Sequence, residues 1–530
     1  MKKAIGRGFE IALLGLAFLA IAGVAVPGLL RVMSPFEFGV GDGLMLDHIL
    51  RVAHGQPLYV EPSLSFISLA YMPLYVYVVA PLVWLFGPHF WPGRLVSLLA
   101  SLGTAYLMMR VIRRETGSVT LGVAGAGLYL IGQGFTKGSY DSIRPDPLML
   151  FLVIAGLATL RFSRGIPGAI GAAALLSAAF FTKQHALCFA GVALLHLLFS
   201  DRRRLPAFAL TLVVGCGGVF LLLTRVLGPW FSFYVYDVPS HWSHLSRGRI
   251  FTYLGSELIG RFGALSIPAV LSLMLPERPW KGASGLWWWV GLGGAATGVL
   301  ATLDPYAFVH TLMPTLAAFA VLGPIALHRL AKPFAAEDGP APGMAVTCAV
   351  LILAFVPLLY PVRAMVPPRR NHSDFEAFER QLRGIPGPLM IPSHGFFAWS
   401  AGKGTSLHTL PLDDIVRARG NRLLKRDPEF FERMFARLRS GPGRPVIIAD
   451  TTLEHCADAS TKLWASLGGS YRETRRLDAA ANIVRPAGGY RGTPSIVYEP
   501  IEPAAGAGGS SAALHVGAPA ETTSAQPAHR

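Results

Sequence analysis

Acidic residues gather in one short stretch of the chain that is also rich in glycine. Glu37, Asp42 and Asp47 lie within about ten residues, and the sequence GVGDG (39–43) falls between them. Glycine lets the backbone turn sharply and approach a ligand closely. Residues 44–54 follow with the apolar spacing of a short amphipathic helix. Carboxylates on a turn beside apolar segments predict chemistry at the boundary between water and lipid. The alternative is a solvated loop in which Asp42 caps the helix.

Other ionisable side chains stand at the ends of later apolar runs. The segment KGSYDSIRPD (137–146) contains Asp141, Arg144 and Asp146, and Lys183 directly follows another apolar run. A charged side chain at the centre of a membrane helix costs about 2.5–3.5 kcal/mol, so ionisable residues near membrane depth usually indicate function. For Lys183 the alternative is a lysine that only reaches from an apolar helix to the lipid headgroups.

The elements that must position these side chains are transmembrane helices. Of the 530 residues, 52% are hydrophobic and only 15% are charged, and the mean hydropathy is +0.46. A soluble protein carries roughly a quarter charged residues. The net charge of +16 is typical of basic cytoplasmic loops that contact anionic membrane lipids. We find no motif for nucleic-acid binding, and the four cysteines show no metal-ligand spacing.

The charges between the apolar runs set the predicted topology. Basic junctions lie at 110–117, 161–165, 201–204, 277–281 and 328–332. They all fall on the cytoplasmic side, together with the N-terminus, only if the apolar run 71–87 does not cross the membrane. At about 17 residues that run is at the short limit for a span. The sequence therefore predicts a polytopic α-helical membrane protein with about eleven spans, in which 71–87 is a juxtamembrane or re-entrant element.

The chain changes character after the last apolar run. We predict a transmembrane domain over 1–365, a soluble periplasmic α/β domain over 366–502 and a disordered tail over 503–530. Within the soluble domain, residues 372–385 and 427–441 have helical patterns, and the predicted strands lie in 387–394, 444–452 and 493–500. The domain has no nucleotide-binding signature. Asp450, at a strand end, is a weaker site candidate and more typical of a turn cap.

Several short motifs follow one another in a fixed order along roughly residues 10–330. They are GDG (41–43), HGQPLY (54–59), MPLY (72–75), FGPHFWPGRLVSLL (86–99), YDSIRPDPLMLF (140–151) and FFTKQHAL (180–187). In this order they resemble the GT-C glycosyltransferases, which include protein O-mannosyltransferases and bacterial lipid A aminoarabinose transferases. The resemblance implies transmembrane helices with juxtamembrane helices in the first periplasmic loop. It also implies a polyprenyl-phosphate sugar donor, used at the periplasmic face of the bacterial inner membrane.

The resemblance implies roles for the acids of the first loop. A hexose or pentose would pass with inversion from the lipid phosphate to a hydroxyl group of a lipid, a glycan or a protein. Many relatives carry adjacent Asp and Glu where this chain has Gly41 and Asp42, so one acid remains there. The acceptor hydroxyl must lose a proton as it attacks, and a carboxylate is the natural general base. We predict Asp42 as that base and Glu37 as the second candidate.

The remaining candidates would handle the donor. Lys183 and Arg144 are predicted to bind its phosphate, which needs positive charge as it leaves. Asp146, or alternatively Asp141, would orient a substrate or a metal. Metal use varies among the relatives, so the cofactor is left open, with a divalent cation as one option.

Two other functional classes compete with the transferase. A transporter or flippase of lipid-linked saccharides would share the helices and the phosphate contacts, but it predicts charges in mid-span and inverted repeats. Neither is clear in this sequence, where ionisable residues cluster at span ends. A membrane scaffold that only presents the soluble domain gives no reason for acids in both early outer loops.

Overall fold

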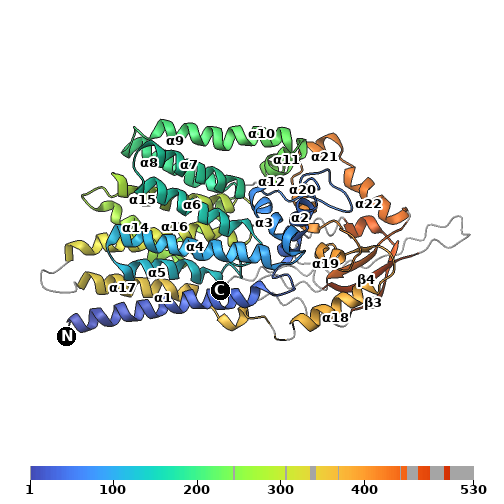
Figure 1. Ribbon diagram of the computed structural model, residues 1–530, viewed down its shortest axis with the longest axis horizontal. Helices are drawn as coiled ribbons and strands as arrows, with labels where there is room; N and C mark the ends of the chain where they lie inside the picture. The colour runs from blue at the N-terminus through green and yellow to red at the C-terminus, as the bar shows by residue number, and fades with distance from the viewer. Residues whose placement is uncertain are drawn as a thin grey trace, which may run out of the picture.

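The chain folds into a bundle of long helices that carries a smaller part with a β-sheet at one end (Figure 1). The computed structural model describes residues 2–501 except 243–244, 305–306, 335–341, 368, 370, 442, 451–462 and 478–493. The tail that the sequence predicts to be disordered, residues 503–530, lies outside the described residues. The prediction of a polytopic helical protein with a small α/β part is confirmed.

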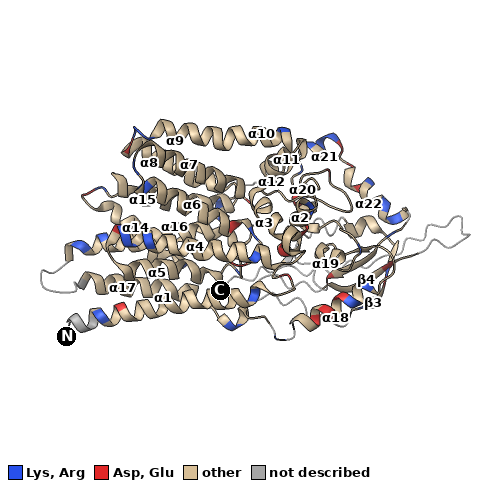
Figure 2. Cartoon of the chain, in the orientation of Figure 1, with Lys and Arg blue, Asp and Glu red and all other residues tan. Residues whose placement is uncertain are grey.

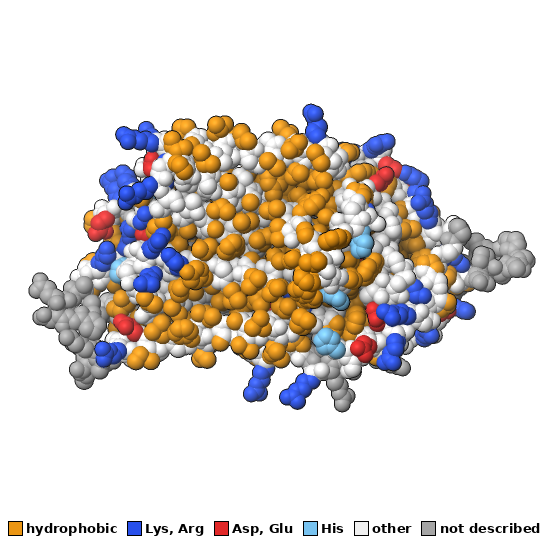
Figure 3. All heavy atoms as spheres, viewed as in Figure 1, with side chains coloured by type: hydrophobic (Ala, Val, Ile, Leu, Met, Phe, Trp, Pro, Cys, Tyr) orange, Lys and Arg blue, Asp and Glu red, His pale blue; other side chains and the backbone are white. Residues whose placement is uncertain are grey.

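The bundle consists of apolar helices that run along its length. They are α1 (Lys2–Val32), α4 (Trp91–Thr116), α5 (Val119–Leu130), α6 (Pro145–Phe162), α7 (Gly165–Thr182), α8 (Ala186–Ser200), α9 (Leu205–Leu212), α10 (Val219–Val226), α14 (Gly263–Leu271), α15 (Leu286–Ala301), α16 (Met313–Ala331) and α17 (Pro342–Phe355). A π-helical stretch, η2 (Val213–Gly218), joins α9 to α10. Large apolar side chains such as Leu19, Leu99 and Leu221 are exposed, and Figure 3 shows them as a broad band between the two ends. Such a band is expected of a surface in contact with lipid.

The number of spans is only partly fixed by helix length. Among the described residues, six helices are long and apolar enough to cross a membrane. There are seven if Arg247–Arg261 and Gly263–Met274, which are bent by 94°, form one span. Other predicted spans coincide with the shorter helices α5, α8, α15 and α17, so the count of eleven stays a prediction. The run 71–87 contains only α3 (Leu74–Phe86), whose 13 residues extend about 20 Å against a hydrocarbon core of about 30 Å.

The two ends of the bundle differ in charge. At the end that holds the N-terminus, Arg161 pairs with Glu115 at 2.6 Å, and Arg204 donates to the carbonyl of Leu160 at 2.9 Å. Figure 2 shows lysine and arginine at this end, and others around the sheet at the opposite end. These contacts join basic junctions that are far apart in sequence, as the charge pattern predicted. The side of the membrane that this end faces stays a prediction.

The C-terminal part combines short helices with one sheet. The helices are α18 (Asn371–Arg383), α19 (Gly395–Ser400), α20 (Thr409–Arg417), α21 (Arg422–Arg426) and α22 (Phe430–Ser440), and the strands are β1 (Leu389–Met390), β2 (Val446–Asp450), β3 (Tyr471–Arg476) and β4 (Pro494–Pro500). The strand order is β1-β2-β4-β3, with β1 and β2 parallel and the other pairs antiparallel. The three predicted strand segments contain β1, β2 and β4. The sequence did not predict β3, because its residues YRETRR lack an apolar face.

The C-terminal part contacts the loops at the far end of the bundle. The N–H of Leu407 donates to the carbonyl of Leu64 at 2.8 Å, and Arg417 pairs with Asp304 at 2.5 Å. Several segments from distant parts of the chain therefore meet at this end. The helix α2 (Val40–Ala53) packs against α19, α12 (Val238–Trp242) packs against α20, and Arg422 of α21 donates to the carbonyl of Pro229 in α11 (Pro229–Ser232). The helix α13 (Arg247–Thr252) follows α12 in the chain. Figure 1 shows α2, α12, α19 and α20 at the junction of the two parts.

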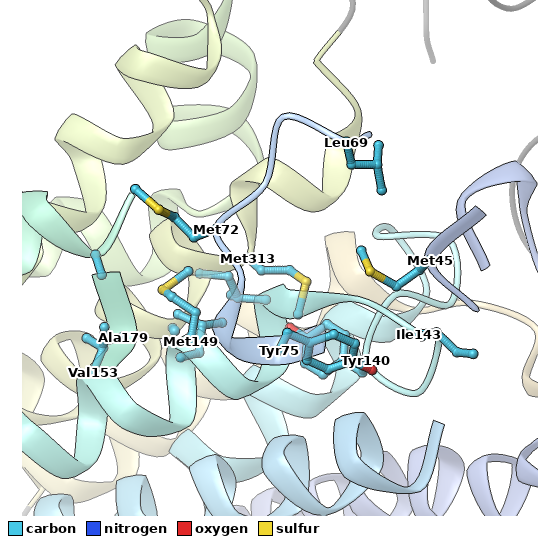
Figure 4. Close-up of a cluster of buried hydrophobic side chains, with 14 of the residues drawn as sticks. Met45, Leu69, Met72, Tyr75, Tyr140, Ile143, Met149, Val153, Ala179 and Met313 are labelled. Atoms are coloured by element: carbon cyan, nitrogen blue, oxygen red, sulfur yellow. The ribbon is translucent and has the colours of Figure 1, made fainter. Parts of the chain in front are cut away.

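A shared apolar core holds the polar loops at this end in place. Figure 4 shows Met72 and Tyr75, from the chain entering α3, close to Met149 of α6 and Met313 of α16. Tyr140 of the 137–146 loop belongs to the same buried cluster. The two loops that carry the candidate site residues are thus packed onto the ends of the long helices, which fixes the backbone from which those residues project.

Candidate active site

The acidic turn forms the start of α2. Gly39 is the N-cap residue and Asp42 lies in the first helical turn, so Asp42 is not the capping residue that the alternative interpretation proposed. The Asp42 carboxylate accepts a hydrogen bond from the N–H of Phe38 at 3.2 Å, and its Oδ2 lies 3.3 Å from Nη2 of Arg94. Both charged side chains are fully buried. A carboxylate in the first turn also benefits from the positive end of the helix dipole.

Arg94 clamps the loop in front of the turn. It projects from the start of α4, donates to the backbone carbonyls of Ser34 and Phe36, and lies 3.8 Å from the centre of the Phe38 ring. The sequence analysis missed this residue. The sequence feature that could have identified it is a single charge at the start of the apolar run 94–112. A charge at such a position costs free energy unless it has partners.

Glu37 is held by the C-terminal part of the chain. Nδ1 of His394 lies 2.7 Å from Oε2 of Glu37, and Nε2 of the same ring lies 3.4 Å from Oδ1 of Asp450. All three side chains are buried. Burial raises the pKa of Glu37, and the facing imidazole offsets part of that rise. Burial alone would lower the pKa of His394, but the carboxylates of Asp450 and Glu37 raise it to about 10.

The acids of the turn keep unused hydrogen-bonding capacity. Oε1 of Glu37 and Oδ1 of Asp42 are buried and have no hydrogen-bond partner among the described residues. Oε1 of Glu37 occupies the space beside Gly43, where a Cβ atom would lie only 1.8 Å from it. A buried acceptor without a donor is costly. These two oxygens are therefore suited to accept a proton or a hydrogen bond from a ligand.

A second charged cluster joins the ends of α6 and α7. Nζ of Lys183, which follows α7, lies 2.7 Å from Oδ1 of Asp146 in the first turn of α6. The ammonium group also lies 5.7 Å from the centre of the Tyr71 ring. One of the three N–H donors of the lysine is used by Asp146, which leaves two for another anion.

Arg144 lies between the two clusters. Its Nη1 is 3.4 Å from Nε2 of His310, and its Nη2 is 3.4 Å from the position of a Cβ atom on Gly41. The guanidinium group therefore contacts the residue just before Asp42, while its own backbone enters α6 two residues before Asp146. This places the acidic turn and the Lys183 cluster at the same end of the bundle.

Asp141 faces a different set of partners. Its Oδ2 pairs with Nε of Arg31 at 2.8 Å, and its Oδ1 accepts from Gln133 at 2.7 Å. Arg31 is the last charged residue of α1 and also donates to the sulfur of Met365 at 3.2 Å. Of the two alternatives for orienting a substrate, only Asp146 lies with Lys183. Asp141 connects α1 to the 137–146 loop.

The described residues include no group of three or more His, Cys, Asp or Glu side chains arranged to hold a metal ion. The acids of the turn are paired with Arg94 and His394, and Asp146 is paired with Lys183. The question of a cofactor therefore remains as the sequence left it, open.

An apolar groove lies between α7 and the α9–α10 segment. It has a volume of about 470 Å³ and is lined by Ala174, Ser177, Ala178, Phe181, Leu210, Thr211, Val214, Gly215 and Val219. The wall formed by α7 ends at Phe181, two residues before Lys183. The groove is thus an apolar surface that leads along α7 toward the second charged cluster.

Comparison with known proteins is informative at the level of structure. No family model and no curated protein matches the sequence. ArnT from Cupriavidus metallidurans is similar in structure both bound to undecaprenyl phosphate (15% identity, TM-score 0.56, 91% of this chain, 98% of ArnT) and in the apo state (16%, 0.55, 91% and 97%). The apo oligosaccharyltransferase of Archaeoglobus fulgidus matches with 12% identity and a TM-score of 0.52, over 88% of this chain and 73% of its own. The chain has the fold of the GT-C membrane glycosyltransferases, as its motifs predicted.

Proposed function

We propose that the chain is a membrane glycosyltransferase that moves a sugar from a polyprenyl-phosphate donor to a hydroxyl acceptor. The observation that carries the proposal is that two buried acids, Arg144 and the Lys183–Asp146 pair lie together at one end of a GT-C fold. One cluster is suited to accept a proton and the other to bind an anion. The similarity to a protein bound to undecaprenyl phosphate supports a lipid-linked donor.

The donor is placed by charge and by apolar contact. Its phosphate binds Lys183 and Arg144, whose cationic side chains stabilise the negative charge that develops as the sugar leaves. Its polyprenyl chain lies in the apolar groove beside α7, which ends close to Lys183. Asp146 holds the Lys183 ammonium in position and is within reach of the sugar hydroxyls that bind there.

The acceptor is activated by the acidic turn. Asp42 takes the proton of the acceptor hydroxyl as that oxygen attacks the anomeric carbon, and the donor phosphate leaves from the opposite face, which inverts the centre. Asp42 is favoured over Glu37 because it lies next to Gly41, which contacts Arg144, whereas Glu37 faces His394. Glu37 stays the alternative base, since burial makes its carboxylate more basic. The acceptor is a hydroxyl of a lipid, a glycan or a protein.

The orientation follows from the charged end of the bundle. Basic loops remain in the cytoplasm, so the end with Arg161 and Arg204 is cytoplasmic and the site and the sheet face the periplasm of a bacterial inner membrane. On that side of the membrane the donor is a lipid-linked sugar, which carries no nucleotide.

The test measures a product that does not depend on the acceptor. The full chain is reconstituted in liposomes with synthetic undecaprenyl-phosphate pentosides and hexosides and an extract of bacterial envelope lipids and glycans. Release of free undecaprenyl phosphate is followed by mass spectrometry. A transferase releases it, and the release disappears when Lys183 and Asp42 are replaced. Movement of intact donor across the bilayer without release would instead identify a flippase.

A further inference from the structure

We infer that His394 is a positioning residue for the proposed transfer reaction, because it bridges Glu37 and Asp450 as an imidazolium and favours the deprotonated form of Glu37 within the acid pair of Glu37 and Asp42. The inference rests on the proposed function and adds that the C-terminal part of the chain completes the active site. It assigns no contact between His394 and a substrate.

The geometry favours a charged ring. Each ring nitrogen of His394 faces a carboxylate oxygen, Glu37 at 2.7 Å and Asp450 at 3.4 Å. A neutral imidazole has one N–H donor and one lone pair, so one of the two carboxylates would then face a lone pair. Only the doubly protonated ring is attracted to both. The raised pKa of His394 agrees with this state at neutral pH.

The surrounding charges show why the acid pair needs this cation. The carboxylates of Asp42 and Asp450 both raise the pKa of Glu37. Without the imidazolium, the Arg94 guanidinium would be the cation paired with them, and it is bound to Asp42. Like charges that are buried together raise one another's pKa. Loss of the His394 charge would therefore raise the pKa of Glu37 further and favour its protonated form, and a protonated carboxyl group cannot act as a base.

Asp47 is a further titratable group near the ring among the residues that the structure describes. Its Oδ2 lies 3.2 Å from the Cβ position of Gly395, the residue after His394. Burial raises the pKa of Asp47 well above its usual range, and Glu37 raises it further. The raised pKa favours the neutral form of Asp47, which makes it a weaker partner for an imidazolium than the other carboxylates.

The ring is held rigidly by the part of the chain that supplies it. His394 directly precedes α19, and its ring stacks on Phe397 with centroids 5.8 Å apart. Phe396 of the same helix packs against Phe90, just before α4, with centroids 4.8 Å apart. Because apolar contacts already dock α19 onto the bundle, docking does not depend on the ion pair of His394 and Glu37 alone. That ion pair can therefore act on the charge of the acid pair.

The test is the pH dependence of undecaprenyl phosphate release from the donors described above. In His394→Gln, an amide N–H replaces the imidazolium and the positive charge is lost. An opposite charge at this distance lowers a carboxyl pKa by about 1–3 units, so the acid limb of the pH–rate profile moves to higher pH by about that amount. Binding of undecaprenyl phosphate itself stays within about twofold of wild type, because the Lys183 cluster is unchanged. His394→Lys, which restores a cation, returns the limb toward its wild-type position.

The control is His408→Gln, which replaces another buried histidine of the same part of the chain. Its Nδ1 accepts the N–H of Leu410 at the start of α20, so its loss lowers stability without moving the acid limb. An unshifted limb in His394→Gln overturns the inference while leaving the transferase intact. A wild-type protein that releases no undecaprenyl phosphate from any donor overturns the proposed function instead.

A measurement on folding covers the case in which His394→Gln does not fold. The pKa of His394 is about 10 in the folded chain and 6.5 for an ordinary histidine. Its stabilising effect is therefore complete below about pH 6.5 and is lost as the pH rises through about 10. Thermal unfolding of the wild type must show this fall between pH 7 and 10, and His394→Asn must flatten it. A wild-type stability that does not fall in this range contradicts a charged His394.

Discussion

Buried charges dominate the site at the scale of single residues. Each has a partner from another segment of the chain: Asp42 with Arg94, Glu37 with His394, and Asp146 with Lys183. Removing one partner of a buried pair leaves an uncompensated charge and typically costs about 3–5 kcal/mol. Substitutions must therefore separate chemistry from folding, and amide replacements of the acids do this best.

Asp42→Asn tests the general base. The amide oxygen still accepts the N–H of Phe38, and Arg94 keeps its bonds to the carbonyls of Ser34 and Phe36. We expect a folded protein whose release of undecaprenyl phosphate falls by about 10²–10⁴, the usual contribution of a general base. The measurement is turnover per folded molecule, with Glu37→Gln beside it. Wild-type turnover in Asp42→Asn together with an inactive Glu37→Gln would assign the base to Glu37.

Lys183 is tested in a background that lacks its partner. Asp146→Asn removes the carboxylate that Lys183→Ala alone would leave buried and unpaired. Comparing Asp146→Asn with Lys183→Ala/Asp146→Asn isolates the contribution of Lys183 to the binding of undecaprenyl phosphate. A hydrogen bond to a charged group contributes about 1.5–3 kcal/mol, so the double variant should bind undecaprenyl phosphate roughly ten- to a hundredfold more weakly. Equal affinities of the two variants would remove Lys183 from the phosphate site.

At the scale of elements, α2 carries Asp42 and Asp47, and its Gly43 leaves room for the neighbouring Glu37. A Cβ atom on Gly43 would lie 1.8 Å from Oε1 of Glu37 and 3.0 Å from Cβ of Phe396. Gly43→Ala must therefore displace Glu37 from its place, although alanine favours helices. We expect most of the turnover to be lost, with undecaprenyl phosphate binding retained. Gly191→Ala in α8 is the matched control, because nothing lies within 4 Å of its Cβ position.

The sequence predicts elements well where one kind of apolar pattern runs long enough. The long helices, α18, α22 and three of the four strands that the structure describes were predicted from pattern alone. It did not predict α19, whose six residues are too few for a helical period to show. The acids were found because carboxylates beside apolar runs are unusual. Their partners Arg94 and His394 were missed, since nothing local in the sequence shows which residue 52 or 357 positions away a side chain pairs with.

At the scale of the whole molecule, topology decides which compartment the site faces. The basic end near Arg161 and the sheet lie at opposite ends of the bundle (Figure 2). We expect a reporter fused after Ile501 to be active only outside the cytoplasm. Alkaline phosphatase and green fluorescent protein, joined at the same position, give opposite readings. Fluorescence without phosphatase activity would place the sheet in the cytoplasm and reject the predicted orientation.

The contact between Glu37 and His394 also determines when the acidic turn is completed during synthesis of the chain. The two residues are separated by 357 positions, and chains grow at about 5–20 residues per second. A nascent chain therefore exposes its acidic turn for roughly 20–70 seconds before the histidine exists. During this interval, Glu37 has no imidazolium to compensate for burial and remains in water or takes up a proton. The acidic turn therefore gains its His394 contact late, once the last quarter of the polypeptide has been synthesised and has folded against it.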